Sequence, residues 1–167
     1  GDIDLAIINT PAMNASLESE TLFEEEKIIV APVGHPLAEN ESISLQDLSG
    51  YELMMTPQGT FFRDSLDEEL SSAGVEMKIS AEIDGLRLLA SLAFQGHAPA
   101  ILPASAVSGY PDDNWVLIRI NGLLKRPVTL IRNKRITPSL PARATNEVIH
   151  EVVKEIGPNQ PGIEVCI

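Results

Sequence analysis

Residues Glu52–Gly74 read ELMMTPQGTFFRDSLDEELSSAG and decide the fold, because they hold a strand, a polar loop and a helix in that order. We expect a strand over Glu52–Thr56, where apolar residues run together, and a helix over Phe62–Ala73. Leu66 and Leu70 lie four residues apart on the inner face of that helix, and a glycine follows its end. A buried strand that leads into an amphipathic helix is a unit from which α/β domains are built.

Strands and helices alternate on both sides of this unit. The other expected strands are Ile3–Ile8, Lys27–Val33, Met77–Ile83, Pro99–Pro103, Trp115–Ile120 and Pro127–Arg132. The other expected helices are Leu86–Gln95 and one that begins near Thr137 and ends at Ile156. The alternation predicts mixed, mostly parallel sheets with helices on their faces.

Composition and charge exclude several classes of protein. The 167 residues carry a formal net charge of -12, which repels the phosphate backbone, so we expect this segment not to contact DNA directly. The single cysteine, Cys166, has no partner for a disulfide, which fits a cytoplasmic location. The longest apolar stretch, Leu86–Val107, is interrupted by polar residues and prolines, so we expect no membrane span. The opening residues also lack the pattern of a signal peptide.

The sequence offers no set of residues suited to catalysis or metal binding. His35, His97 and His150 are far apart and lack the spacing of a zinc site, so we expect neither a metal nor a cofactor. No nucleophile elbow, HExxH motif or Walker loop is present, so we assign no catalytic residue. The acidic run between Glu18 and Glu26 is interpreted as a solvated face. His35, which precedes a proline, is expected to serve turn geometry.

Several motifs occur together in one order. They are GDIDLAI at Gly1–Ile7, IVAPVGHPLA at Ile29–Ala38, LQDL at Leu45–Leu48, QGTFFR at Gln58–Arg63, AG at Ala73–Gly74, LLASLAFQG at Leu88–Gly96 and ILP at Ile101–Pro103. In this order and spacing, over roughly residues 1–157, the chain resembles the effector-binding domain of a LysR-type transcriptional regulator. It departs from that family at residues 96–99, where GHAP replaces the usual GLGI.

The resemblance implies a type 2 periplasmic-binding-protein-like α/β fold, with two Rossmann-like lobes and a cleft between them. Lobe I is then residues 1–37 with 127–157, lobe II is residues 38–126, and residues 158–167 form a loose tail. The strands at Lys27–Val33 and Pro127–Arg132 are expected to pair at the hinge. Compared with the family, the N-terminal winged-helix domain and the first part of lobe I are absent from the sequence.

Candidate ligand-binding residues lie in loops that follow strands, where open α/β sheets bind their ligands. They are Asn9, Thr10, Thr56, Gln58, Gly59, Thr60, Ile83 and Asp84. Hydroxyl and amide groups in the loop at 56–60 suit a carboxylate or a polar metabolite. In the family, loops corresponding to 56–60 and 83–84 contact effectors.

Each candidate also has a purely structural interpretation, which the sequence leaves open. Thr60 and Asp84 are residue types that cap helices, and Asn9 and Thr10 suit a turn before a proline. Arg63 suits a surface ion pair with Asp67, four residues on in the same helix.

The resemblance implies a sensor and not an enzyme. A small-molecule effector would be bound, and the domain would form a homodimer or homotetramer with the helix Leu86–Gln95 as a candidate interface. DNA would be contacted only through the missing N-terminal domain. Two alternatives remain: a solute-binding receptor of the same fold and a two-lobed α/β enzyme.

Overall fold

The computed structural model describes residues 3–10, 14–107 and 113–167 and divides the chain into two compact units. Unit 1 is Gly1–Glu25 with Lys125–Ile167, and unit 2 is Glu26–Leu124. The sequence placed the boundaries after residue 37 and before residue 127, so the first one lies earlier than expected.

Strand pairing explains the earlier boundary. β3 (Lys27–Pro32) pairs antiparallel with β7 (Ala100–Pro103) and with β8 (Trp115–Asn121), so its backbone groups are bound inside unit 2. The expected pairing of β3 with β9 (Arg126–Asn133) is therefore wrong. β9 pairs instead with β2 (Leu17–Glu25) in unit 1.

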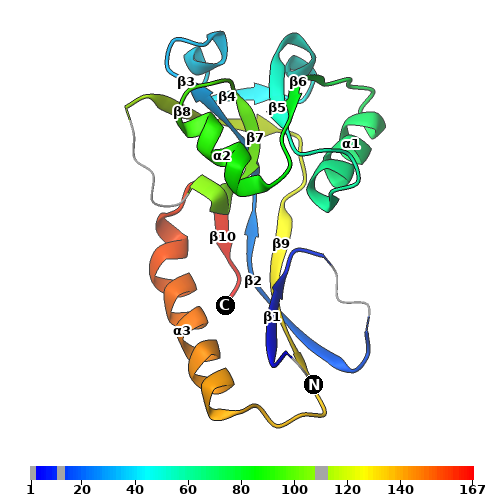
Figure 1. Cartoon of the computed structure of the whole chain (residues 1–167), viewed down its shortest axis with the longest axis vertical. Helices are drawn as coiled ribbons and strands as arrows, with labels where there is room; N and C mark the ends of the chain where they lie inside the picture. The colour runs from blue at the N-terminus through cyan, green and yellow to red at the C-terminus, as the bar shows by residue number, and fades with distance from the viewer. Residues whose placement is uncertain (1–2, 11–13, 108–112) are drawn as a thin grey trace. The chain divides into compact units, whose positions relative to one another are not determined.

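The sheet of unit 1 has the strand order β1-β9-β2-β10, and all of its described pairings are antiparallel (Figure 1). β1 is Leu5–Ile8 and β10 is Ile163–Val165. The expectation of mostly parallel sheets is thus wrong for this unit. Parallel neighbours are usually joined by a crossover helix, but β9 and β10, the strands on either side of the helix at residues 140–156, are not neighbours in this sheet.

The C-terminal segment is not a loose tail. β10 pairs antiparallel with β2, and the amide of Cys166 donates to the carbonyl of Leu22 at 2.9 Å. Gly157, just before this segment, leaves room for it, because a Cβ there would lie 2.5 Å from Val165 Cγ2. The segment belongs to the sheet of unit 1.

The helix of unit 1, α3, spans Leu140–Ile156. Its N-cap is Ser139, whose hydroxyl accepts from the amide of Ala142 at 3.3 Å. The expected start near Thr137 was therefore two residues too early. On the sheet, Glu18 accepts a hydrogen bond from Arg132 Nε at 2.7 Å, and this guanidinium lowers the pKa of the Glu18 carboxyl.

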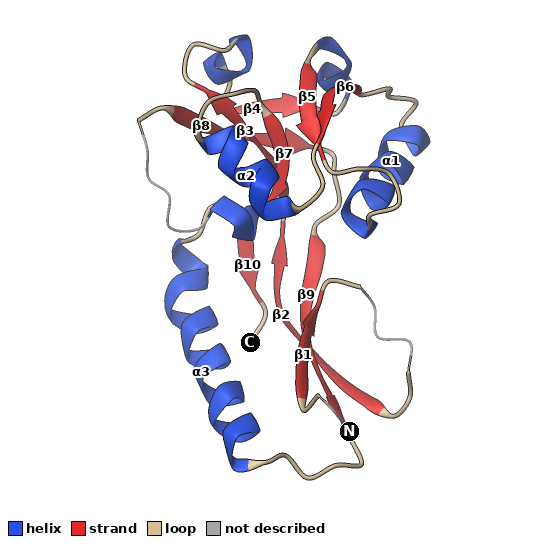
Figure 2. Cartoon of the chain, viewed as in Figure 1, coloured by secondary structure: helices blue, strands red, loops and turns tan. Residues whose placement is uncertain are grey.

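The sheet of unit 2 is mixed, with the order β4-β8-β3-β7-β5-β6. β5 (Glu52–Met55) pairs parallel with β6 (Lys78–Glu82) and with β7, and β4 (Ser42–Ser44) pairs parallel with β8. α1 (Phe61–Ser72) and α2 (Leu86–Phe94) lie on opposite sides of this sheet (Figure 2).

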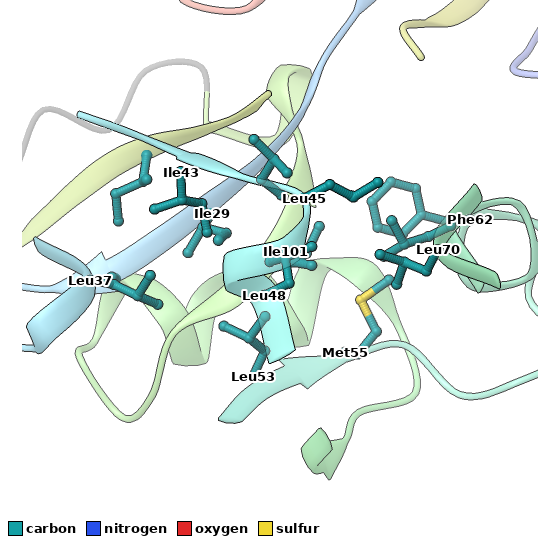
Figure 3. Close-up of a cluster of buried hydrophobic side chains, with 14 residues drawn as sticks. Ile29, Leu37, Ile43, Leu45, Leu48, Leu53, Met55, Phe62, Leu70 and Ile101 are labelled. Carbon is teal, nitrogen blue, oxygen red and sulfur yellow. The ribbon is translucent and has the colours of Figure 1, made fainter. Parts of the chain in front are cut away.

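Alternating side chains of the central strands supply two apolar cores, one under each helix. Under α1, the buried cluster contains Ile29, Ala31, Leu37, Ile43, Leu45, Leu48, Leu53, Met55, Phe62, Leu66, Leu70, Ile101, Ile118 and Ile120 (Figure 3). Under α2, it contains Val30, Met54, Leu89, Ala90, Ala93, Ala100 and Leu102. Neighbours in a strand point to opposite faces, so unit 2 is a three-layered α/β domain.

The end of α1 confirms the sequence prediction. Gly74 has a φ of +67°, and the amide of Val75 donates to the carbonyl of Leu70 at 2.9 Å, as in a helix end closed by a left-handed glycine. His35 also acts as expected, because its Nδ1 accepts from the amide of Leu37 at 3.2 Å and closes a turn.

Candidate functional site

The loops after β5 and β6 meet at one edge of the sheet in unit 2. These two strands are parallel, so their carboxyl ends lie together, and the amide of Ile83 donates to the carbonyl of Met55 at 2.8 Å. Six of the predicted residues are thereby brought to this edge: Thr56, Gln58, Gly59, Thr60, Ile83 and Asp84. We call residues 56–60 the first loop and residues 83–85 the second loop.

Two threonine side chains close the first loop on itself. The Thr60 hydroxyl lies 2.9 Å from the carbonyl oxygen of Pro57 and 3.0 Å from the Thr56 hydroxyl. One hydroxyl carries one proton, so Thr60 donates to Pro57 and accepts from Thr56. Thr60 occupies the N-cap position of α1 by its backbone, but its side chain makes no capping bond. The structure thus gives Thr60 a third role, holding the loop.

Gly59 turns the first loop toward α1. Its φ of +85° suits glycine, and a Cβ there would meet no atom within 4 Å, so backbone conformation and not crowding requires it. Its amide donates to Asp64 Oδ1 at 2.9 Å. Asp64 was not among the predicted site residues, although an aspartate in the first turn of a helix often accepts from backbone amides.

Arg63 is buried, and its guanidinium has three partners instead of one. Its Nε donates to both carboxylate oxygens of Asp67, at 2.9 and 2.8 Å, so the expected ion pair is present. Arg63 is only 6% exposed, however, and its Nη1 donates to the carbonyl of Thr56 and to Glu82 Oε1, each at 3.1 Å. It therefore ties α1 to the ends of β5 and β6.

The second loop corrects the expectation that Asp84 caps α2. Gly85 is the N-cap, with a φ of +94° and a ψ of 110°, and its carbonyl accepts from the amide of Leu89 at 3.1 Å. The chain needs a positive φ at that point, which only glycine adopts without strain. Asp84 is exposed, and within the described part of the chain its carboxylate has no hydrogen-bond partner.

Asn9 and Thr10 directly follow β1 in unit 1, and both are half-buried. Residues 11–13, which contain the proline of their expected turn, lie outside the described residues. The two side chains remain candidates by sequence alone.

The outer face of α2 carries an open groove of about 780 Å³. It is lined by Leu86, Arg87, Ala90, Ser91, Phe94 and Gln95 together with Ala106. The Phe94 ring packs at 5.1 Å between centroids on Trp115, the one tryptophan of the sequence. Leu88, on the same helix, is 53% exposed. The groove thus combines apolar side chains with the polar side chains of Arg87, Ser91 and Gln95.

Over residues 3–10, 14–107 and 113–167, His, Cys, Asp and Glu side chains do not gather in groups of three that would hold a metal ion. In the same ranges, every helix is too short or too polar to cross a bilayer.

A three-layered domain with polar loops at one edge of its sheet is a ligand-binding architecture. Residues 1–154 match the family model of the LysR substrate binding domain, and the chain belongs to this family. The type 2 periplasmic-binding-protein-like α/β fold expected from the sequence is confirmed, with the mixed sheets described above.

Three known proteins show the range of similarity. The transcriptional dual regulator GltC of Bacillus subtilis (strain 168) is 29% identical over 142 residues, which cover 83% of this chain and 47% of GltC. The regulatory domain of CcmR from Synechocystis PCC6803, solved in complex with 2-PG, has a TM-score of 0.76 at 16% identity and covers 93% of this chain and 76% of that one. The effector binding domain of QuiR, in complex with shikimate, has a TM-score of 0.69 at 23% identity, over 91% and 72% of the two chains.

The chain spans about half the length of GltC. The relatives found by sequence are transcriptional regulators and not enzymes.

Proposed function

We propose that this chain is the effector-sensing part of a transcriptional regulator and that it binds a small molecule without changing it chemically. The observation that carries the proposal is the edge of unit 2, where Gln58 and Asp84 are exposed and make no hydrogen bond to the rest of the described chain. Thr56, Gly59, Thr60 and Ile83 hold the two loops around them. Asn9 and Thr10, which follow β1, stay proposed as ligand-binding residues.

The similar proteins described above support this proposal. CcmR and QuiR hold 2-PG and shikimate, respectively, and GltC is a transcriptional regulator. The net charge of -12 opposes contact with phosphates, so we assign DNA binding to a part of the protein outside this chain. Such a regulator would work in the cytoplasm, where it meets the DNA.

Ligand screening by thermal shift tests the binding proposal. The panel begins with 2-PG and shikimate and extends to amino acids, sugar phosphates and aromatic acids. A ligand present at 100 times its Kd adds about 2.7 kcal/mol to the free energy of unfolding and raises the Tm. For a ligand that carries an ammonium or hydroxyl group we expect both Gln58→Ala and Asp84→Ala to lose most of this shift, because both side chains are exposed and make no hydrogen bond to the described chain. For a purely anionic ligand we expect the loss in Gln58→Ala alone, because the Asp84 carboxylate repels anions.

Gln46→Ala is the matched control, because Gln46 is also exposed in unit 2 but lies before β5, away from both loops. Its ligand-induced shift should equal that of the unchanged chain. An undiminished shift in both Gln58→Ala and Asp84→Ala would remove the two loops from the site. Turnover of a bound molecule would favour the enzyme alternative instead.

We also propose that the open face of α2 pairs with a second copy of the chain. Leu88 on this helix is 53% exposed, and Leu86, Ala90 and Phe94 line the groove; exposed apolar side chains gathered on one helix are typical of an interface. Leu88→Glu should weaken self-association at least tenfold in sedimentation equilibrium, because it places like charges across the interface.

Phe61→Glu is the control for this prediction. Phe61 is 50% exposed on α1, on the opposite side of the sheet from α2. Equal weakening by both substitutions would point to an effect of charge alone, and a monomeric unchanged chain would exclude the interface.

A further inference from the structure

Charged side chains are concentrated where the chain crosses between the units. The chain leaves unit 1 after Glu25 and returns to it after Leu124. On the unit 1 side, Glu25 is 0% exposed and accepts from Arg126 Nε at 2.8 Å and from Nη2 at 2.6 Å. Lys125 pairs with Glu164 at 2.6 Å. The expectation that residues 18–26 form a solvated face is therefore wrong at its end, because Glu25 is buried.

A second set of charges holds the returning segment on the unit 2 side. Lys27 is 2% exposed, and its Nζ donates to Glu69 Oε1 at 2.6 Å and to the carbonyl of Leu124 at 3.0 Å. The amide of Leu124 donates to Glu69 Oε2 at 2.8 Å. Both backbone polar groups of Leu124 are thus bound by one ion pair, which we call the Lys27–Glu69 latch.

The latch connects the crossing to the candidate site through a single helix. Glu69 lies near the end of α1, a helix of 12 residues, which is about 18 Å long. At the other end of α1, Arg63 and Asp64 hold the first loop through Thr56 and Gly59. A hydrogen-bonded helix moves as a rigid element, so a shift of the loop carries Glu69 with it.

We propose that Lys27 and Glu69 are positioning residues that hold Leu124, where the chain returns to unit 1, against α1. A ligand that displaces the first loop would then also displace Leu124. The ligand part of this inference rests on the proposed function, whereas the order of the crossing depends on the latch alone. The latch restrains the backbone of Leu124 through its amide and its carbonyl. Without the latch, the φ and ψ angles of Leu124 should vary more widely.

The test measures the spread of distances between the units by double electron–electron resonance. Spin labels are attached at Glu52→Cys in unit 2 and Glu151→Cys in unit 1, both exposed positions, in a chain that also carries Cys166→Ser. The variant is Lys27→Met with Glu69→Leu, which removes the latch without leaving a buried charge unpaired. We expect the width of the distance distribution to at least double.

Glu68→Leu is the matched control, because Glu68 is the exposed neighbour of Glu69 on α1 and its carboxylate makes no hydrogen bond within the described residues. The width of the distance distribution in this variant should equal that in the unchanged chain. Hydrogen exchange supplies a second measurement: the amide of Leu124 should exchange at least tenfold faster in the latch variant, because it loses the Glu69 acceptor.

Circular dichroism first tests whether the latch variant is folded. If it is not, the same two measurements are made on the single variant Lys27→Met. An unchanged distance width together with unchanged exchange at Leu124 would overturn the proposal. Failure of the ligand screen would count against the proposed function and leave these two results intact. With a ligand in hand, the ligand should alter exchange at Leu124 in the unchanged chain and not in the latch variant.

Discussion

Replacing Glu69 by leucine lowers the free energy of unfolding of unit 2 by about 3–5 kcal/mol, because it leaves the Lys27 ammonium buried without its carboxylate. Lys27 is 2% exposed, so water cannot take the place of the lost partner. The carbonyl of Leu124 remains as an acceptor, but a neutral oxygen compensates for an anion only in part. Urea denaturation followed by far-ultraviolet circular dichroism measures the loss.

A double-mutant cycle separates the buried charge from the packing around it. Adding Lys27→Met to Glu69→Leu should recover most of the loss, since a buried ion pair replaced by apolar side chains of similar size is often close to neutral in stability. Glu68→Leu, one residue away and exposed, should change stability by no more than about 0.5 kcal/mol. Losses that simply add in the double variant would show that Lys27 and Glu69 do not interact.

The double-mutant cycle measures what Lys27 and Glu69 contribute to the free energy of unfolding, whereas the distance measurement reports whether they position Leu124. If the latch matters only for stability, the double variant restores both the free energy of unfolding and the narrow distance distribution. If it positions the crossing, stability returns while the distribution stays broad, because Leu124 has still lost its two partners.

Sequence alone predicted the parts of the fold that depend on neighbouring residues. The strand, loop and helix at 52–74 follow from the apolar strand, the four-residue spacing of Leu66 and Leu70, and the glycine that ends the helix. The gathering of the two loops at one edge followed from the general rule for parallel strands. Family motifs supplied the fold class.

Long-range pairing was predicted less well, because strands of similar composition have several possible partners. β3 and β9 are both rich in β-branched residues, and nothing local distinguishes a pairing between them from the pairing of β9 with β2. The short β10 has too few residues to stand out from a loop, and its partner lies about 140 residues earlier in the chain.

The candidate site shows the same limit at the level of single side chains. The Arg63–Asp67 pair was visible as an i,i+4 spacing, but the contacts of Arg63 with Thr56 and Glu82 join residues 7 and 19 positions apart. Asp84 was expected to cap α2 because aspartate is a common cap, yet the chain reverses at Gly85 and leaves the carboxylate exposed. The loops were predictable, whereas their internal bonds required the fold.

Leu66→Ala should destabilise unit 2 by about 2–5 kcal/mol, because it opens a cavity between α1 and the sheet. Leu66 is 0% exposed and lies in the same cluster as Leu53, Met55, Phe62 and Leu70. Strands and helix both contribute to that cluster, so neither can collapse onto the gap without losing its hydrogen bonds elsewhere. Urea denaturation reports the loss, and Trp115 fluorescence reports whether the α2 face unfolds with it.

Phe61→Ala is the control that distinguishes the destabilising effect of the cavity from the effect of shortening any apolar side chain on α1. Phe61 is 50% exposed on the same helix, so its truncation removes little buried surface and should cost less than about 1 kcal/mol. Equal losses in the two variants would mean that α1 is not packed on the sheet by its Leu66 face. A large loss confined to Leu66→Ala, with Trp115 unfolding in the same transition, would show that both cores of unit 2 form one cooperative structure.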